Sequence, residues 1–527
     1  MKVKTVLIVG GGSAGWMTAA ALTKFCPHLK VDLIESPIHP VIGVGESTLA
    51  HIRDFFQILE IDEKKFLKET GAIYKVGIRF HDFYKKGESW TYPFGQLNAC
   101  NPPTGLSYWF HLNNHNPKKY PADTCSLAYE PTGWLSKENR FPTNESRKTN
   151  RRVGWDESAD IAYHLDAVKT GEWFSNNLCE GVTQHIGIID KAFKKDNGEI
   201  ESLVTTDGRR LSYDLYVDCS GFKSILLEKE MKSKWISYNV KDGGCFANDR
   251  AITCQIPHTN PEVDVKNTTE CTALDNGWVW DVSLWERSGV GYVHSSSFVD
   301  EETATEELYD YIVKTRGHHV AAKSQFRTID FRNGKHEKSW VKNVCGVGLA
   351  NCFIEPLEAT GIHMTHQQIV RLCSTLSEEN VTASDIAMVN KECDDEIETI
   401  KGFVASHFAF SARDTAYWKY ISEDVEYDFD NPNPKQNFFA RLRNVKHEDY
   451  IFTSNDYNLG LVYVAGGMHQ NPITNVTSKI NTLENNWEKD VLIEECDEYF
   501  DDYKETMLEW VRSQPSTYQY FKEYIHD

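Results

Sequence analysis

The sequence predicts an α/β protein whose first part is a doubly wound parallel sheet. An apolar run at 4–9 is typical of a buried strand, 14–25 of a packed helix rich in small residues, and 30–34 of a second strand. Strand, helix and strand in this order form a βαβ unit, whose crossover is right-handed and whose strands pair in parallel. The chain therefore opens with an α/β module.

A glycine cluster, Gly10-Gly-Gly12-Ser13-Ala14-Gly15, joins the first strand to the first helix. A GxGxxG motif in this position binds a dinucleotide, because glycines permit close backbone approach and the free amides of the helix start face a pyrophosphate. Glu35 closes the second strand, 20 residues past Gly15, where a carboxylate can accept hydrogen bonds from a ribose. A glycine turn used only for packing remains the alternative.

Two later segments carry weaker dinucleotide signals. The first, Asp218-Cys-Ser-Gly221, ends a strand and resembles the second flavin-binding motif of FAD monooxygenases. The second, Gly346-Val-Gly348-Leu349, lacks a helix-opening glycine at the expected place. One complete fingerprint predicts one dinucleotide site and none reserved for NADPH. Reduced flavin would then come from a separate flavin reductase or from another source.

The remaining chain predicts inserted sheets followed by helices. Strand-like blocks at 73–80, 214–217 and 278–282 are separated by long polar stretches, and helix formers dominate from about Leu376 onward, with helical spacing of apolar residues across 487–524. We expect an FAD-binding module of the Rossmann type, glutathione-reductase-like and discontinuous, over 1–375, with an inserted sheet on the substrate side. A mainly helical region, 376–527, is expected to complete the substrate pocket.

The overall composition excludes several classes of partner. The 527 residues include 77 acidic and 56 basic ones, a formal charge of -21 that repels phosphate backbones and anionic lipid heads. We therefore expect neither a nucleic acid nor a membrane partner, and no apolar run reaches the roughly 18 residues of a membrane span. The 13 cysteines form no CxxC pairs and are expected to be reduced thiols of a cytoplasmic protein. No residue set suggests a metal site, and a symmetric homo-oligomer stays open.

Several segments, in order along the chain, resemble the flavin-dependent tryptophan halogenases. They are the first glycine motif, Gly43-Val-Gly45-Glu46-Ser47-Thr48, Tyr74-Lys75-Val-Gly77-Ile, Tyr92-Pro-Phe94-Gly, Gly277-Trp-Val-Trp280, Gly346-Val-Gly-Leu-Ala350, Glu355-Pro-Leu-Glu358-Ala-Thr-Gly-Ile362 and Arg413-Asp-Thr-x-Tyr-Trp418. Singly, most of these segments could be chance matches, but jointly and in this order they are specific.

The resemblance implies catalytic roles for Lys75 and Glu358. In the family a lysine handles the hypohalous acid made at the flavin, and an ammonium can donate a hydrogen bond to that acid or, once deprotonated, form a haloamine. The glutamate could accept the proton lost by the halogenated ring or position the electrophile. The alternatives are a solvent-facing strand lysine within 73–80 and a carboxylate that only stabilises a helix start.

The same resemblance assigns binding residues. Thr360 and Gly361, at a helix start where free amides favour an anion, would contact the halide. Tyr92 and Phe94 match positions where the family clamps an indole between flat side chains, although both could be ordinary core aromatics. The cofactor residues are Gly10, Gly12, Ser13, Ala14, Gly15, Glu35, Gly45, Glu46, Ser47, Asp218, Gly348 and Leu349.

The chain departs from the family pattern in two places. The Trp-x-Trp-x-Ile-Pro motif appears here as Trp278-Val-Trp280-Asp-Val282-Ser283, which keeps both tryptophans and loses the proline. In the family this motif is thought to disfavour monooxygenation by keeping substrate away from the flavin. The serine that usually follows the active-site glutamate is Ala359, which removes a hydroxyl between the flavin and substrate sites.

The leading hypothesis is a halogenase that forms hypohalous acid from FADH2, O2 and chloride, bromide or iodide. Lys75 and Glu358 would face a cavity walled off from the isoalloxazine and deliver the electrophile to an electron-rich aromatic small molecule of the indole or phenol type. The alternatives are an FAD-dependent aromatic hydroxylase and a non-catalytic flavin-binding protein. Halide preference, exact substrate and carrier attachment are open at this stage.

Overall fold

The computed structural model describes residues 1–38, 43–95, 103, 107–143, 153–378, 380–428, 456–471 and 486–527. The chain forms two compact units, each built from three separate segments. The first unit is Met1–Ala72, Leu165–Gly244 and Asp330–Lys401, and the second is Ile73–His164, Cys245–Ile329 and Gly402–Asp527. The boundaries of these compact units differ from those of the expected regions 1–375 and 376–527. The expected functional division, an FAD-binding module and a region that completes the substrate pocket, stays a prediction.

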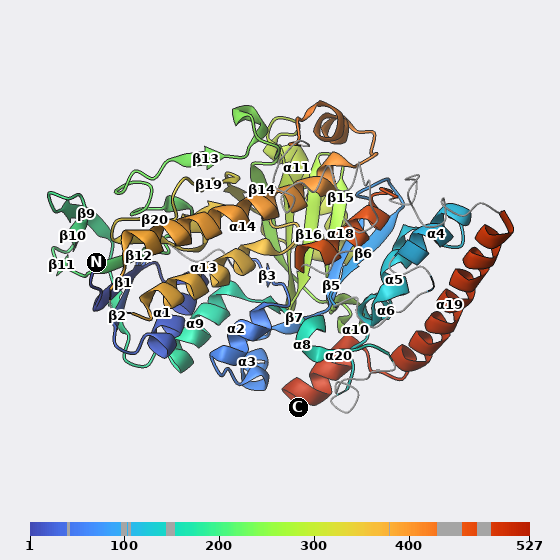
Figure 1. Ribbon diagram of the computed structural model, residues 1–527, viewed down its shortest axis with the longest axis horizontal. Helices are drawn as coiled ribbons and strands as arrows, with labels where there is room; N and C mark the ends of the chain where they lie inside the picture. Colours follow the sequence, from blue (N-terminus) through green and yellow to red (C-terminus); the bar gives the residue numbers. More distant parts are fainter. Residues whose placement is uncertain are drawn as a thin grey trace. The chain divides into compact units, whose positions relative to one another are not determined.

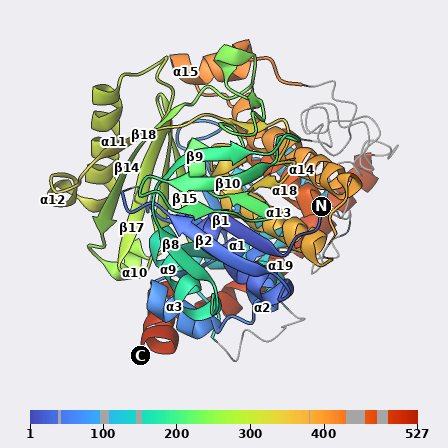
Figure 2. The same cartoon turned by 90° about the vertical axis from the view of Figure 1, so that its left-hand side faces the viewer.

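The first unit is organised by a six-stranded sheet of order β20-β21-β12-β1-β2-β8. The strands are β1 (Thr5–Val9), β2 (Lys30–Glu35), β8 (Thr183–Ile186), β12 (Leu215–Asp218), β20 (Trp340–Val341) and β21 (Val344–Gly346). All neighbours pair in parallel except β20 with β21, and Figure 2 shows β1, β2 and β8 side by side. The predicted βαβ opening and the parallel sheet are confirmed.

Helices cover this sheet because their apolar faces need burial. The helix α1 (Ser13–Phe25) has a continuous buried stretch from Gly15 to Leu22 and packs against α9 (Ala167–Leu178) and α13 (Thr360–Leu376) (Figure 1). The unit also contains α2 (Ile52–Ile58), α3 (Glu63–Thr70) and two small sheets, β9 (Ile189–Lys194) with β10 (Ile200–Thr205) and β11 (Arg210–Leu211), and β13 (Trp235–Ser237) with β19 (Gly334–His336) and β22 (Cys352–Phe353). The long helix α14 (Ala383–Ala409) carries the boundary between the units at Lys401.

The second unit contains a seven-stranded sheet of order β18-β14-β17-β16-β15-β5-β6. Its strands are β5 (Gly77–His81), β6 (Ser89–Pro93), β14 (Arg250–Pro257), β15 (Thr268–Leu274), β16 (Gly277–Ser283), β17 (Arg287–His294) and β18 (Arg327–Asp330). The early strands β5 and β6 extend the sheet formed by the later ones, with β5 parallel to β15 (Figure 1). The helix α11 (Glu301–Arg316) packs on β14 and β17 and closes an apolar core.

The segment 73–80 was expected to form one strand, but the strand is interrupted at Val76. There β4 (Ile73–Lys75) ends and β5 begins, and β4 pairs with β7 (Ala162–Leu165) instead of continuing in the large sheet. The amide of Val76 donates to the carbonyl of Asn267, and its carbonyl accepts from the amide of Phe94. Lys75 therefore lies outside the alternation that the sequence suggested.

Most of the described residues after Leu376 are helical, as expected, and the segment 487–524 forms more than one helix. The helices of this part of the second unit are α15 (Ala416–Lys419), α18 (Asp456–Gly467), α19 (Asn486–Arg512) and α20 (Thr517–Tyr520). The break after Arg512 contains Pro515, which cannot continue a helix, and Ser516 with Gln519 forms a capping box that starts α20. No helix among the described residues has the length and hydropathy needed to span a bilayer.

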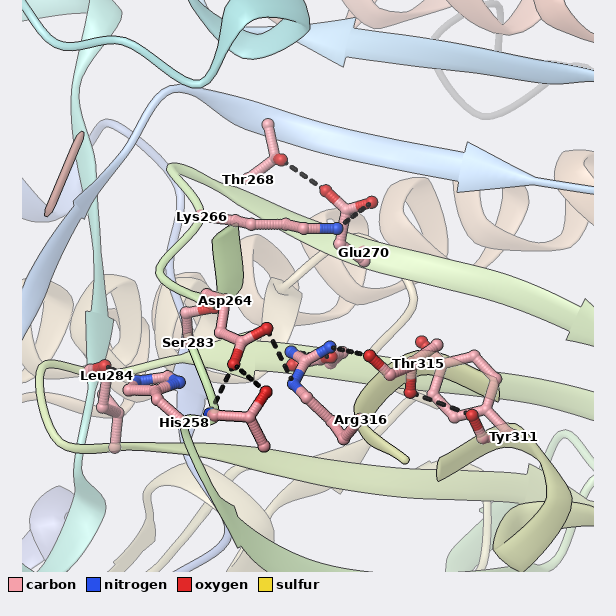
Figure 3. A network of polar contacts seen from close by, with 12 residues as sticks. His258, Asp264, Lys266, Thr268, Glu270, Ser283, Leu284, Tyr311, Thr315 and Arg316 are labelled. Carbon is pink, nitrogen blue, oxygen red and sulfur yellow. Dashed lines mark hydrogen bonds and ion pairs between the residues drawn. The ribbon is translucent and has the colours of Figure 1, made fainter. Parts of the chain in front are cut away.

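A buried ion cluster ties α11 to the large sheet of the second unit. The guanidinium of Arg316, 5% exposed, lies 2.9 Å from Asp281 and 3.4 Å from Asp264, both carboxylates being 4% exposed. Figure 3 shows Arg316 and Asp264 at the centre of this network. Asp264 also accepts hydrogen bonds from the amides of Thr259 and Asn260, so its charge is well compensated.

We expect Arg316→Met to destabilise the protein by about 3–5 kcal/mol, because it leaves two buried carboxylates without their counter-ion. Urea unfolding followed by tryptophan fluorescence measures the change. Arg327→Met makes the same chemical change at an exposed site on β18 and is expected to alter stability by at most about 0.5 kcal/mol. Equal losses in the two variants would contradict a special role of the cluster.

Candidate functional site

The glycine motif lies at the carboxyl ends of the parallel strands, where nucleotides bind in open α/β sheets. Gly10, with φ +124°, passes so close to the end of β12 that an added Cβ would lie 2.2 Å from the carbonyl oxygen of Cys219. An added Cβ on Gly15 would lie 1.9 Å from the carbonyl oxygen of Gly10. These contacts explain why the turn requires glycine, and they bring the first and second motifs together.

Helix α1 starts at Ser13, directly after this turn. Its N-cap is Gly12, which has an extended backbone and no side chain to cap the first amides. The amides of Ser13, Ala14 and Gly15 occupy the first turn, where the positive end of the helix attracts a phosphate. This arrangement fits the pyrophosphate of FAD.

Glu35 ends β2 beside the turn, as expected. An added Cβ on Gly11 would lie 1.6 Å from a carboxylate oxygen of Glu35, so this carboxylate lies directly against the glycine cluster. It also accepts a hydrogen bond from the amide of Gln184 on β8. The position suits a ribose contact, and Gln184 is a neighbour that the sequence did not reveal.

Asp218 stabilises the loop that follows β12. Its buried carboxylate accepts hydrogen bonds from the amides of Leu226 and Leu227, at 2.7 and 2.8 Å, and from the amide and hydroxyl of Ser220. Although these bonds favour the charged form, burial raises the pKa of the Asp218 carboxyl. Its direct contact with FAD stays a prediction, and the hydrogen bonds show that it holds the loop after β12.

The third segment also converges on the first. Gly348, with φ +67°, starts the short 3-10 turn Gly348–Ala350 that contains Leu349, and an added Cβ would lie 3.2 Å from the Cβ of Ala14. The amide of Gly348 donates to the side-chain oxygen of Gln368 at 2.8 Å. The spacing of the sequence carried no signal for Gln368, because the contact joins two elements through the fold.

The segment that contains Gly45, Glu46 and Ser47 lies beside the start of α9. Gly45 has φ +93°, Glu46 and Ser47 form the short strand β3, and an added Cβ on Gly43 would lie 2.9 Å from Val168. Burial and then the negative charge of Asp166, the N-cap of α9, raise the pKa of Glu46 to about 7. Glu46 is therefore a carboxyl group that titrates near neutral pH in the first unit.

The start of α13 is suited to an anion. Ala359, at φ 56°, is the N-cap and offers no side-chain bond. The hydroxyl oxygen of Thr360 is buried and has no hydrogen-bond partner among the described residues, and an added Cβ on Gly361 would meet no atom within 4 Å. A buried donor and open space at a helix N-terminus fit a halide. Glu358, just before this turn, is 0% exposed.

Lys75, at the end of β4 in the second unit, is buried with 0% exposure, so the solvent-facing alternative is wrong. Its Nζ lies 4.8 Å from the centroid of the Phe94 ring, within the range of a cation–π contact. Burial and then the charge of Lys75 lower the pKa of His164 to about 3. His164 is therefore neutral, with Nδ1 donating to the carbonyl of Ser283 and Nε2 accepting from Thr269, both at 2.9 Å.

Tyr92 and Phe94 belong to a group of aromatic rings in the second unit. Their ring centroids are 6.1 Å apart and their planes meet at 90°, so the two rings present one face and one edge and do not form a parallel clamp. Tyr92 also contacts the rings of Phe403 at 6.1 Å and Tyr463 at 5.9 Å. The hydroxyl of Tyr463 lies 3.4 Å from the buried carboxylate of Glu130, a group that the sequence analysis missed.

The missing proline of the tryptophan motif has a structural explanation. The strand β16 continues through Ser283, which pairs with Ser288 of β17, and the hydroxyl of Ser283 donates to the carbonyl of Asp264. A proline there would remove both the amide and the hydroxyl. Trp278 is 0% exposed, and the ring of Trp280 covers Gly291, where an added Cβ would lie 2.1 Å from it.

The glycine cradle at the carboxyl ends of the parallel strands defines an FAD-binding enzyme of the α/β class. A model of the family described as tryptophan halogenase matches residues 5–479. The chain therefore belongs to the tryptophan halogenase family and is a flavin-dependent halogenase, an oxidoreductase. The resemblance found in the motifs is confirmed.

Known relatives match most of the chain. The tryptophan 7-halogenase RebH of Lentzea aerocolonigenes is 30% identical over 437 residues, which cover 79% of this chain and 78% of RebH. The apo structure of VirX1 is similar with a TM-score of 0.89 and 32% identity, covering 100% of this chain and 99% of that one. The tryptophan 6-halogenase SttH of Streptomyces toxytricini has a TM-score of 0.83 and 26% identity, covering 98% and 99%.

The raised pKa of Glu46 predicts a pH dependence of stability. A carboxyl group that keeps its proton up to about pH 7 in the folded state stabilises that state most below its ordinary pKa of 4.5, and this contribution is lost as the pH rises through about 7. Glu46→Gln should remove the effect. The melting temperature of the parent, relative to that of the variant, should fall between about pH 5 and pH 8.

Thermal melts across this pH range measure the difference. Glu60→Gln, at a residue whose side chain is 77% exposed, serves as the control and should follow the parent. Parallel profiles for the parent and Glu46→Gln would contradict the assignment.

Proposed function

We propose that the chain forms hypohalous acid from FADH2, O2 and a halide and uses it to halogenate an electron-rich aromatic molecule. The reduced flavin supplies the oxidising chemistry with O2. The cradle around Gly10 to Gly15, with Glu35, the segment Gly45 to Ser47 and the turn at Gly348 and Leu349, is proposed to hold the cofactor, with Asp218 bracing one of its loops. Thr360 and Gly361 are proposed to hold chloride, bromide or iodide.

The burial of Lys75 carries the proposal. An ammonium removed from water is costly to maintain, and a lysine at 0% exposure beside a neutral histidine and an aromatic face is the kind of group that functional sites retain. Here Lys75 would donate a hydrogen bond to the hypohalous acid or form a haloamine. Bulk water is kept from the amine, which protects an electrophile from loss.

Glu358 is proposed to act on the same reaction. A carboxylate at 0% exposure can accept the proton that leaves the ring after halogenation, provided that it is ionised at that step. Lys75 belongs to the second unit and Glu358 to the first, and their joint action on one substrate is part of the proposal.

The substrate is proposed to be an indole or a phenol. Tryptophan is the first compound to test, because the relatives RebH and SttH are named as tryptophan halogenases. The rings of Tyr92 and Phe94 are proposed to contact the substrate face to face and edge to face. We call the rings of Tyr92, Phe94, Phe403 and Tyr463 the aromatic wall. The buried carboxylate of Glu130, hydrogen-bonded to the hydroxyl of Tyr463, adds a polar group beside it.

The supply of reduced flavin is proposed to come from a separate reductase. The cytoplasm is proposed as the compartment, because the twelve described cysteines form no disulfide with one another, the state that a reducing compartment favours.

We expect Lys75→Met to abolish halogenation while leaving flavin binding and peroxide release intact. Methionine has a length similar to that of lysine and can occupy the space of the buried side chain, and circular dichroism together with FAD binding checks that the variant is folded. The assay combines purified protein with a flavin reductase, NADH, FAD, each halide in turn and a panel of indoles and phenols, with products identified by mass spectrometry.

Lys86→Met, at an exposed lysine, is the matched control and should retain the parental rate. Halogenation by Lys75→Met at the rate of the parent would contradict the proposed role of the Lys75 amine. A hydroxylated product from the parent would favour the aromatic hydroxylase, and FAD binding without turnover would favour a non-catalytic flavin protein.

Gly460 tests the proposed aromatic wall. An added Cβ there would lie 2.9 Å from Phe403 and 3.1 Å from the Tyr92 hydroxyl. We expect Gly460→Ala to displace these rings and raise the KM for the aromatic substrate about tenfold, the equivalent of about 1.4 kcal/mol. Steady-state kinetics against tryptophan and a smaller phenol measure the effect.

Gly466→Ala is the control in the same helix, because its added Cβ would lie 2.7 Å from Cys125 and 3.1 Å from Trp109, away from Tyr92. Both variants are crowded and should lose stability to a similar extent. If Gly466→Ala changes the substrate KM as strongly as Gly460→Ala, the change reflects general strain and not the wall.

A further inference from the structure

A buried histidine in the first turn of α13 is bonded to the neighbouring helix. The Nε2 atom of His363 lies 3.3 Å from a carboxylate oxygen of Glu396 on α14, and the two side chains are 4% and 8% exposed. A contact between buried ionisable groups is screened little by water. The first turn of α13 is therefore tied to α14 at this point.

Glu396 does not depend on His363 for charge compensation. The guanidinium of Arg371, farther along α13, binds the other oxygen of Glu396 and lies 3.3 Å from Glu392. Although burial alone would raise it, the contacts with His363 and Arg371 hold the pKa of the Glu396 carboxyl below its usual range. Glu396 is an anchored carboxylate, and His363 is the group that the contact positions.

His363 also contacts the segment that follows the proposed flavin residues. The ring centroids of His363 and His51 are 5.3 Å apart, and His51 is the N-cap of α2, three residues after Thr48. One turn farther along α13, His366 stacks on Phe55 of α2 at 5.8 Å. The imidazole of His363 is thus in contact with both α14 and the start of α2.

We propose that His363 is a positioning residue that fixes the first turn of α13, where Thr360 and Gly361 would bind halide, relative to the flavin segment 43–51. This inference rests on the proposed halide role of that turn. Ala359, which stands where the family usually has serine, gives this turn no side-chain cap, so the contacts of His363 are those that join the turn to neighbouring elements. The tie has two parts, the hydrogen bond to Glu396 and the ring contact with His51.

Two substitutions separate the hydrogen bond from the packing. His363→Phe keeps a buried ring against His51 and loses the bond to Glu396, whereas His363→Gln keeps a side-chain donor for Glu396. We expect His363→Phe to raise the KM for bromide about tenfold, with kcat at saturating bromide and the Kd for FAD changed less than twofold. His363→Gln should restore most of the parental KM. If His363→Phe does not fold, His363→Leu serves the same comparison.

Leu372→Ala is the control for a general loss of stability, because it removes a buried apolar side chain of α13 and leaves the contact between His363 and Glu396 in place. It should lower the melting temperature and leave the bromide KM unchanged. A second measurement needs no turnover: bromide should raise the melting temperature of the flavin-free parent above that in an equal concentration of acetate, and this difference should be lost in His363→Phe.

The outcomes separate the two levels of the proposal. A parent that shows saturable, bromide-dependent halogenation together with a His363→Phe variant of unchanged bromide KM and unchanged thermal response overturns the positioning role alone. A parent with no halide-dependent product overturns the proposed function. An equal rise of the bromide KM in Leu372→Ala and His363→Phe also overturns the specific role of His363.

Discussion

The close passage of backbone at Gly10 is the constraint on which the first unit depends. The ends of β1 and β12 approach so closely there that a single methyl group would lie 2.2 Å from a carbonyl oxygen. The five parallel strands β21, β12, β1, β2 and β8 have their carboxyl ends at one edge of the sheet, and the turn at Gly10 places the start of α1 at that edge. Glu35 and Gly348 reach the same edge from the neighbouring strands. Glycine at this turn costs conformational entropy on folding, and the free energy of cofactor binding can offset that cost.

The second unit contains two buried basic side chains, Arg316 and Lys75, in different surroundings. Arg316 is held between two carboxylates, the arrangement expected when a charge only supports a fold. Lys75 lies 4.8 Å from the centroid of the Phe94 ring and beside His164, a histidine that burial keeps neutral. A buried lysine amine is the kind of group that functional sites retain, and this burial is the observation on which its proposed role rests.

At the two positions where the sequence differs from the family pattern, Ser283 and Ala359, the structure shows other contacts at or next to the changed residue. Ser283 stands where the family has proline. Its carbonyl accepts a hydrogen bond from His164, and its hydroxyl donates one to the carbonyl of Asp264. Ala359 lacks the usual hydroxyl, and the neighbouring turn of α13 is instead held by His363. Departures of this kind preserve the position of an element while changing the bonds that hold it.

Much of this protein followed from the sequence alone. The glycine motif between a strand and a helix, with Glu35 at the end of the next strand, determined the class of fold, because only a few residue types satisfy that turn. The ordered motifs also identified the family. Local signals sufficed here because each depends on the backbone conformation of a few consecutive residues. Pro515 and Ser516 were similarly available as a helix break, although the apolar spacing of 487–524 concealed it.

Only the tertiary structure decided the burial of Lys75 and the perpendicular planes of Tyr92 and Phe94. Alternation along 73–80 placed the lysine with the polar residues, and the break at Val76, set by bonds to Asn267 and Phe94, removed it from that pattern. The contacts of Gln368, Glu130 and His363 were equally hidden, since each joins elements far apart in the chain. Sequence spacing records what neighbours along the backbone can do, whereas burial and side-chain contacts depend on which elements the fold packs together.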